Sequence, residues 1–156
     1  MWEPYQQLRL AQEEAALHAF MPSFKFHNRL TNTYVAGRWL SNTNQQYDIR
    51  IYVPAGYPDD IPHTYVTSPS PLYGYGTLKR IEAYGDSHKM HTWKTDRPGW
   101  VKICIVQPED WSAAYSLVKV LRKAMLWVTA YECHLDDGKA IAKFLKLFLT
   151  GGIHGI

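Results

Sequence analysis

Cysteine is scarce in this sequence, which contains two among its 156 residues, Cys104 and Cys133. In a reducing compartment two cysteines seldom form a structural disulfide, so each is judged as a core residue, a ligand or a nucleophile. Zinc sites favour Cys-x₂₋₄-Cys pairs, and the sequence has none to combine with His88 and His91. We therefore expect no metal site and no other cofactor.

Long apolar runs and clusters of basic residues are also missing. No segment approaches the roughly 20 apolar residues of a membrane span, and the Met1-Trp2-Glu3-Pro4 start lacks the charged region of a secretory signal. No more than two lysine or arginine residues occur in succession, and the formal net charge is +3. DNA or RNA binding needs a clustered basic face. We expect a cytoplasmic protein that binds neither membranes nor nucleic acids.

Apolar residues are abundant, at 46% of the chain, and aromatic residues make up 14%. This composition supports one packed domain over residues 1–156. Residues 2–20 are expected to form a helix that starts near Pro4. Alternating and β-branched residues predict four strands, which are placed at residues 24–30, 34–40, 47–53 and 63–67.

The second half of the chain divides into an irregular segment and two helices. Glycine and proline interrupt residues 68–99, and irregular segments of this length are often functional. A helix is expected after Asp110 with Ser112 as its N-cap, and a break is expected at residues 134–138. A final helix should follow from Ile141, and residues 151–156 should fray. Short polar connections favour an antiparallel meander, so the predicted class is α+β.

Several motifs in this order resemble the ubiquitin-conjugating enzyme (UBC-like) family. The resemblance covers nearly the whole chain and rests on four segments: Tyr52-Val53-Pro54 with Tyr57-Pro58 and Pro62, Gly99 to Ile105 around Cys104, Trp111-Ser112 with its following helix, and Asp136-Asp137 before the last helix. It implies a UBC-like fold with an N-terminal helix, a four-stranded antiparallel meander, a long irregular active-site segment and C-terminal helices. It also implies that Cys104 is the catalytic cysteine.

The residues around Cys104 agree with that role. A thiolate is both a good nucleophile and a good leaving group, so it can hold an activated carboxyl and release it to an amine. Cys104 should be half-exposed, and the cation of Lys102 beside it should favour the thiolate. The alternative is a small buried hydrophobic residue between Ile103 and Ile105. Cys133 matches no active cysteine of the family and is interpreted as structural.

The resemblance assigns further site residues. His91 stands where the family has a histidine that braces the active-site loop, although an ordinary loop histidine remains an alternative. Trp93 stands in place of the family's asparagine, from which the sequence departs, and it could donate to an oxyanion only in a different geometry. Trp93 and Lys102 are predicted to contact substrate. Asp137 matches the acidic residue that orients the incoming amine, or else it caps the final helix, as Asp136 also could.

The partners follow from the resemblance as well. Residues 91–93 resemble the His-x-Trp of bacterial relatives found in anti-phage (CBASS) operons, beside a cGAS-like nucleotidyltransferase whose C-terminus is the acyl donor in some systems. The implied partners are a protein acyl donor, either that nucleotidyltransferase or a ubiquitin-like modifier, and a target protein with an acceptor amine. Two alternatives stay open: a catalytically inactive UBC-like binding or scaffold module, and a cysteine hydrolase, which lacks a recognisable base or oxyanion motif.

Overall fold

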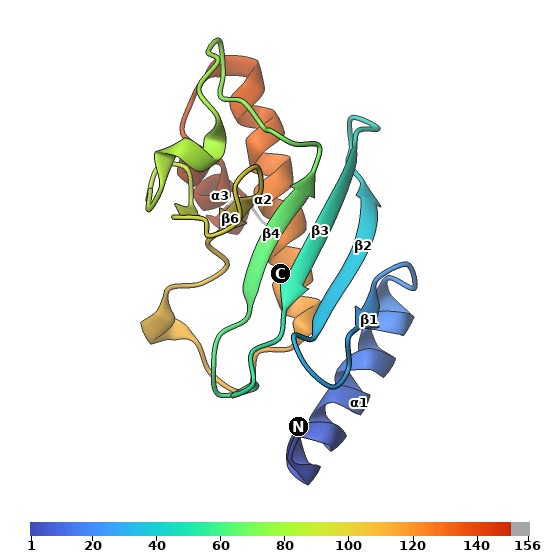
Figure 1. Cartoon of the computed structure of the whole chain (residues 1–156). Helices are drawn as coiled ribbons and strands as arrows, with labels where there is room; N and C mark the ends of the chain where they lie inside the picture. The colour runs from blue at the N-terminus through green and yellow to red at the C-terminus, as the bar shows by residue number, and fades with distance from the viewer. Residues whose placement is uncertain (151–156) are drawn as a thin grey trace.

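The computed structural model describes residues 1–150 and has an α+β architecture (Figure 1). Helix α1 (Pro4–Phe20) precedes the sheet, and helices α2 (Leu117–Asp137) and α3 (Ile141–Thr150) follow it. The predicted class, with an N-terminal helix and C-terminal helices, is confirmed. The tail predicted to fray, and with it the expected end of the domain at residue 156, lies outside the described residues.

Within residues 1–150 the sheet contains six strands, all antiparallel, in the order β1-β2-β3-β4-β6-β5. The first four form the predicted meander: β1 (Lys25–His27), β2 (Tyr34–Leu40), β3 (Gln46–Tyr52) and β4 (His63–Ser68). Strand β1 is shorter than predicted because Asn28 adopts a left-handed conformation with φ 56° and ends it. The alternation in β3 buries Ile49 and Ile51, which are 1% and 0% exposed.

The predicted count of four strands is wrong, because two short strands complete the sheet. Strands β5 (Thr92–Trp93) and β6 (Val101–Ile103) pair with each other, and β6 pairs with β4. Each is too short for alternation to stand out in the sequence, and glycine and proline surround both. The rest of the irregular segment contains one turn of 3₁₀ helix, η1 (Ile81–Tyr84), and a second, η2 (Pro108–Asp110), follows β6.

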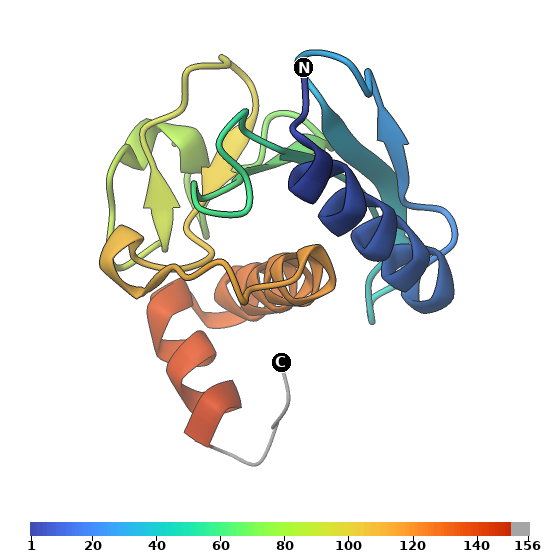
Figure 2. The same ribbon diagram turned by 90° about the horizontal axis from the view of Figure 1, so that it is seen from below.

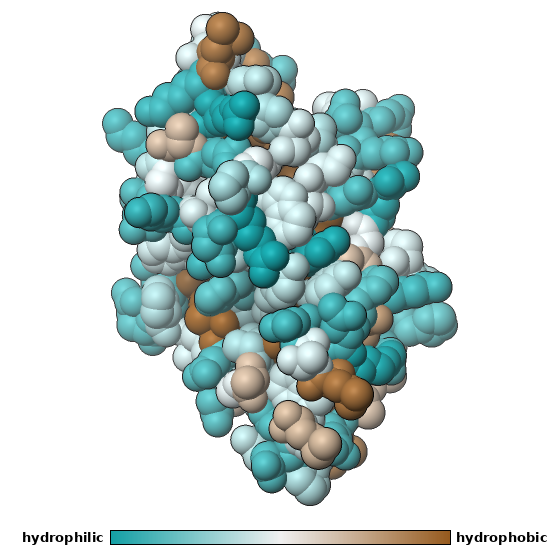
Figure 3. Space-filling model, in the orientation of Figure 1, coloured by the Kyte–Doolittle hydropathy of each residue, from teal (hydrophilic) through white to brown (hydrophobic). Residues whose placement is uncertain are grey.

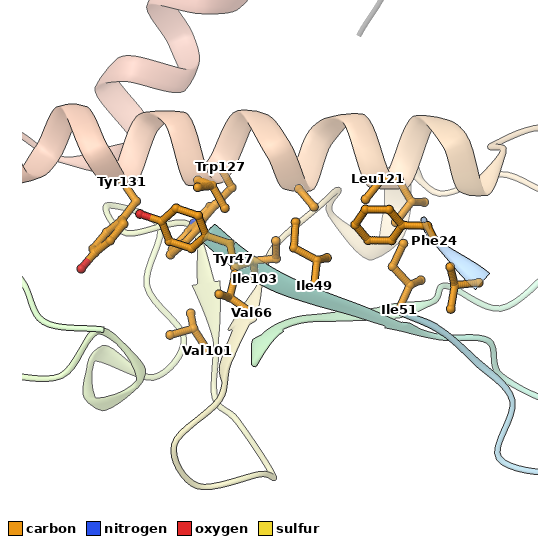
Figure 4. Close-up of a cluster of buried hydrophobic side chains, with 14 of the residues drawn as sticks. Phe24, Tyr47, Ile49, Ile51, Val66, Val101, Ile103, Leu121, Trp127 and Tyr131 are labelled. Carbon is orange, nitrogen blue, oxygen red and sulfur yellow. The ribbon is translucent and has the colours of Figure 1, made fainter. Parts of the chain in front are cut away.

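The helices gather on one side of the sheet. Figure 2 shows α2 and α1 beneath the sheet, with α3 against α2 on the side away from the strands. Figure 4 shows the side chains that fill the space between α2 and the strands, among them Trp127 and Leu121 from the helix and Ile103 from β6. Burying a large apolar side chain of this kind stabilises the fold by about 2 kcal/mol. Within residues 1–150 no helix covers the opposite face of the sheet.

The ends of α2 differ from the prediction. Ser116, and not Ser112, is the N-cap, and its side chain accepts a hydrogen bond from the Lys119 backbone N–H at 3.0 Å. The helix continues through His134 to Asp137, where Gly138 ends it with φ 76°. The predicted break at residues 134–138 is therefore too early.

His134 explains this extension of the helix. Its ring is buried, Nε2 accepts from the Tyr75 backbone N–H at 3.1 Å, and Nδ1 lies 2.7 Å from the Lys139 carbonyl oxygen. These contacts join the last turn of α2 to the irregular segment. None of the helices in residues 1–150 combines the length and apolar character that crossing a membrane requires.

Candidate functional site

Cys104 directly follows β6, at the end of the short β5–β6 ladder. Its backbone N–H donates to the carbonyl oxygen of His91 at 2.9 Å. His91 has a left-handed backbone with φ 54°, and its Nδ1 lies 3.3 Å from the His88 carbonyl oxygen. The structure therefore brings two of the predicted site residues, Cys104 and His91, into direct contact.

The thiol of Cys104 is more buried than expected. The residue is 8% exposed, so the prediction of a half-exposed cysteine is wrong. It nevertheless lines a pocket of about 60 Å³, together with His91, one cation and several apolar side chains. These are Ile105, Lys123, Leu126, Trp127, Leu145 and Leu149. This small, mostly apolar pocket, which lies between His91, helix α2 and helix α3, is the access to the sulfur.

The charges around the thiol come from residues that the sequence pattern did not single out. Burial raises the pKa of Cys104 to about 11; the cation of Lys123 opposes this shift, and the carboxylate of Glu109 adds to it. A thiol with this pKa is protonated at neutral pH. Lys123 comes from α2, and only the fold brings it to the sulfur.

Lys102 does not supply the expected cation at the thiol. Its neighbours in β6, Val101 and Ile103, point into the core, so the alternation of the strand turns Lys102 to the other face of the sheet. Lys102 lies opposite Trp93 in the β5–β6 register. The two line a second pocket of about 190 Å³, together with His63. The pKa of His63 is lowered by burial and by the charge of Lys102.

This second pocket adjoins the first. Ile105 lines both of them, so Trp93 and Lys102 lie on one side of Ile105 and Cys104 on the other. The predicted substrate-binding pair is therefore brought together, beside the thiol and not in contact with it. Trp93 does not line the pocket of Cys104, where an oxyanion donor would be needed.

Gln107 supplies an amide that the sequence reasoning missed. Its side-chain Nε2–H donates toward the Sγ of Cys104 at 3.8 Å. Gln107 directly precedes η2, and that turn carries it back to the cysteine. A glutamine three positions after a cysteine has no distinguishing pattern in the sequence, so only the fold identifies it.

Asp137 lies at the end of α2 and lines neither of the two pockets. Its side chain accepts a hydrogen bond from the Lys139 backbone N–H at 3.0 Å and pairs with the Lys139 ammonium at 3.6 Å. Its charge acts on Cys133, whose pKa is raised by burial and by the carboxylates of Asp136, Asp137 and Glu132. The structure therefore groups Asp137 with Cys133 and leaves it apart from the residues that line the Cys104 pocket.

No group of three or more His, Cys, Asp or Glu side chains within residues 1–150 could hold a metal ion. Comparison with known protein families, with curated proteins and with solved structures found no match for this chain. The chemistry of the site is therefore argued from its own geometry, and the family resemblance stays a prediction.

Proposed function

We propose that the protein is a UBC-like acyl carrier that holds a protein C-terminal carboxyl as a thioester on Cys104 and transfers it to an amine. The main support is the contrast between the two cysteines. Cys104 lines a pocket that contains a cation, Lys123, whereas Cys133 lies among carboxylates. A positive charge stabilises a thiolate and a negative charge opposes it, so Lys123 favours a thiolate at Cys104 in a way that the charges around Cys133 do not, although burial raises the pKa of both cysteines.

The reaction would proceed in two transfers. The Sγ of Cys104 attacks the carbonyl carbon of an activated donor, the new C–S bond forms, and the donor's leaving group departs with the proton of the thiol. A primary amine of the target then attacks the thioester carbon. The C–S bond breaks, an amide forms, and the amine proton returns to the sulfur, which restores the Cys104 thiol.

Gln107 is the residue best placed to assist these steps. The thioester oxygen lies two bonds from the sulfur, so an amide N–H that reaches the sulfur is near enough to donate to that oxygen after acylation. Its donor would stabilise the negative charge on that oxygen in both transfers. Gln107 would then supply the amide that the family has as asparagine, where this chain has Trp93. His91 would hold the loop through its contact with the Cys104 backbone.

The second pocket would receive the donor. A C-terminal tail leading to Cys104 has to cross the surface beside it, and Ile105 joins the thiol pocket to the one formed by Trp93 and Lys102. Trp93 offers an aromatic wall and Lys102 a cation. These groups suit an extended, partly polar peptide.

The raised pKa of Cys104 sets a condition on this function. At neutral pH a thiol with a pKa near 11 is a thiolate in about one molecule in ten thousand. Docking of a donor would have to lower that pKa, by bringing a positive charge or by moving the apolar side chains that cover the sulfur. Leu145 and Leu149 of α3 are the side chains in a position to move.

The resemblance suggests the biological setting, a bacterial anti-phage operon in which a cGAS-like nucleotidyltransferase is the acyl donor. The charges of helix α1 agree with this setting. A standard activating enzyme docks on basic residues of the first helix, and α1 does not offer them. Arg9 of α1 is engaged with Glu13 and with the Tyr115 carbonyl oxygen. Asp137 would orient the acceptor amine only if the acceptor reached the end of α2.

The test uses protein donors prepared with an activated C-terminal thioester, either a cGAS-like nucleotidyltransferase or a ubiquitin-like modifier. The proposal predicts an adduct on a non-reducing gel that a thiol reagent removes. Cys104→Ala should abolish this adduct, and Cys133→Ala should leave it unchanged. An adduct that survives Cys104→Ala would refute the proposal.

The burial of Cys104 favours a second candidate, a UBC-like scaffold that binds its partners without acylation. The low exposure and high pKa of the thiol are the observations behind it. A scaffold would retain the donor protein in a pull-down, and Cys104→Ala would not change the amount retained. A hydrolase would instead release free acid from the activated donor.

A further inference from the structure

The face of the sheet opposite the helices carries a second recognisable surface, which we call the outer face. Figure 3 shows this face, over which strongly hydrophilic and intermediate residues are intermixed. It consists of the outward side chains of the strands and the adjoining loop at residues 96–100. Cations outnumber carboxylates on it. The carboxylates are Asp48 and Asp96, and the cations are Lys25, Arg38, Arg50, Arg97 and Lys102.

The strand register aligns three of these cations. Lys25 is opposite Ala36, Ala36 is opposite Arg50, Arg50 is opposite Tyr65, Tyr65 is opposite Lys102, and Lys102 is opposite Trp93. One row of side chains therefore crosses all six strands of the described sheet, and cations occupy β1, β3 and β6. Neighbouring strands are about 4.8 Å apart, so successive cations in the row are separated by about 10 Å.

Aromatic rings hold the arginines in place. The guanidinium of Arg50 lies 4.3 Å from the ring centre of Tyr34 and 5.0 Å from that of Trp100. The guanidinium of Arg97 lies 4.3 Å from the ring centre of Tyr52 and also stacks on Trp100. Stacking fixes the flat faces of both guanidinium groups. The Nη1 of Arg50 donates to the Tyr52 hydroxyl at 3.3 Å, and its other N–H groups remain for a ligand.

The two carboxylates of this face have other partners, although the pKa of Asp96 is lowered by the hydrogen bond from Tyr65 and also by the nearby charges of Lys102 and Arg97. Asp48 pairs with Arg38 at 2.9 Å, and Asp96 accepts a hydrogen bond from the Tyr65 hydroxyl at 2.7 Å. Within residues 1–150, neither Arg50, Arg97 nor Lys102 forms an ion pair. The Nε of Arg50 is shielded from solvent and has no hydrogen-bond partner among the described residues.

The face is also hollowed at both ends of the row. A depression of about 420 Å³ is lined by Arg38 and Arg50 together with residues of β1 to β4. The pocket of Trp93 and Lys102, about 190 Å³, lies at the other end. We propose that the outer face binds an extended acidic segment of a partner protein, whose carboxylates meet the edges of Arg50, Arg97 and Lys102.

Charge and geometry favour an acidic peptide over a nucleic acid. Single-stranded nucleic acids stack their bases on open aromatic faces, and here the arginines already cover the rings of Tyr34, Tyr52 and Trp100. The carboxylate groups of a peptide instead suit the fork of guanidinium N–H donors. A segment in the polyproline II conformation has three residues per turn and advances about 3.1 Å per residue, so an acidic residue at every third position would face the row at a spacing of about 9 Å.

The test measures fluorescence anisotropy with a labelled peptide of Glu-Gly-Ser repeats and a matched peptide of Gln-Gly-Ser repeats. The proposal predicts that the full-length protein binds the glutamate peptide and does not bind the glutamine peptide. Arg97→Gln and Lys102→Gln should each weaken binding about fivefold. Lys143→Gln, an equal charge change on α3, should leave binding unchanged. Because the peptide carries no activated carboxyl, its binding is independent of acyl transfer at Cys104.

A measurement on the unsubstituted protein guards against variants that fold poorly. Addition of the glutamate peptide should shift the backbone amide signals of β3, β4 and β6 in an NMR spectrum and leave those of α2 in place. Three results would overturn the proposal. They are equal binding of both peptides, an equal loss of binding in Lys143→Gln, and binding of a labelled oligothymidylate in preference to the glutamate peptide.

Discussion

At the scale of single residues, the reactivity of Cys104 is decided by two opposing influences. Burial beside Ile105 and Trp127 disfavours the charged thiolate, and Lys123 favours it. Burial is the larger of the two, because the pKa is raised to about 11. The cysteine is therefore held as a neutral thiol, which is less easily oxidised than a thiolate.

This balance predicts a characteristic pH dependence. The rate at which iodoacetamide alkylates Cys104 should rise about tenfold per pH unit from about pH 7 to pH 10, because the thiolate fraction grows throughout this range. Lys123→Gln should slow the reaction about threefold at a given pH, since it removes the opposing cation. Peptide mapping by mass spectrometry gives the rate at each cysteine. Lys119→Gln, also on α2, is the matched control. A rate that levels off below about pH 9 would contradict the raised pKa.

The amide of Gln107 gives a second prediction at this scale. Gln107→Ala should slow acylation of Cys104 by a protein thioester about tenfold, because the N–H donor for the developing oxyanion is lost. Gln107→Glu keeps the size of the side chain and removes the donor, so it should be at least as slow. The unfolding free energy of both variants should stay within about 0.5 kcal/mol of the parent, as measured by urea denaturation. Unchanged acylation in both variants would exclude this role.

The residue scale also shows what sequence alone could find. Cys104 and His91 were both predicted as site residues, because each stands in a segment that resembles an active-site motif of the UBC-like family. Lys123 and Gln107 were not predicted, because each reaches the thiol from an element whose orientation has no local signature. An amphipathic helix such as α2 carries several lysines, and the pattern does not indicate which one faces the end of β6.

At the scale of elements, α3 controls access to the thiol. Leu145 and Leu149 line the Cys104 pocket, whereas Leu147 on the same helix is 52% exposed and does not line it. The helix is short and packs on α2, away from the sheet. Its first residue, Ile141, is buried in the hydrophobic core, whereas Leu147 and Leu149 further along are 52% and 55% exposed.

Leu145→Ala should therefore raise the alkylation rate of Cys104 several-fold, because it removes part of the apolar cover of the sulfur. Leu147→Ala changes the same residue type on the same helix and should leave the rate unchanged. Both rates are read by mass spectrometry at a fixed pH. If the two variants react alike, then the helix does not restrict access to the thiol.

A second prediction at this scale concerns the join between α1 and α2. Glu13 is 5% exposed, pairs with Arg9 at 3.1 Å and accepts a hydrogen bond from the first backbone N–H of α2, at Leu117. Glu13→Ala should lower the unfolding free energy by about 3 kcal/mol, because it removes the carboxylate that pairs with the partly buried Arg9 and leaves the helix-terminal N–H of Leu117 without its acceptor. Urea denaturation measures the change.

Glu14→Ala is the control for this substitution. Glu14 forms an ion pair with Arg29, and both side chains are largely exposed to solvent. Such pairs contribute less than about 1 kcal/mol. Equal destabilisation by the two substitutions would show that the Glu13 contacts do not hold the helices together.

The elements also differ in how clearly the sequence predicts them. Strand β2 was placed at its observed bounds, and the alternation of β3 identified its buried isoleucines, because long alternating strands carry a strong signal. Strands β5 and β6 were missed, since β6 is defined by its pairing with β4, a contact distant in sequence, and β5 is defined by its pairing with β6. The start of α2 was placed at Ser112 because Ser112 and Ser116 are equivalent as N-caps by residue type.

At the scale of the whole molecule, the two faces of the sheet differ in the residues and elements that lie on them. The helices and the apolar core occupy one face, as Figure 2 shows, and the Cys104 pocket lies beside the end of β6, between α2 and α3. The other face is cationic and aromatic, and one end of its row of cations reaches the pocket of Trp93 and Lys102 beside the thiol. The fold therefore places the proposed acyl-transfer site and the proposed docking surface next to each other.

The most direct test of the central claim is the acylation of Cys104 itself by a small donor. The full-length protein is incubated with a peptide thioester that ends in Gly-Gly, and its intact mass is measured before and after hydroxylamine. The account predicts one added acyl group, which maps to Cys104, is absent from Cys104→Ala and is released by hydroxylamine. Acylation at Cys133 alone, or no acylation at any pH up to the pKa of Cys104, would contradict it.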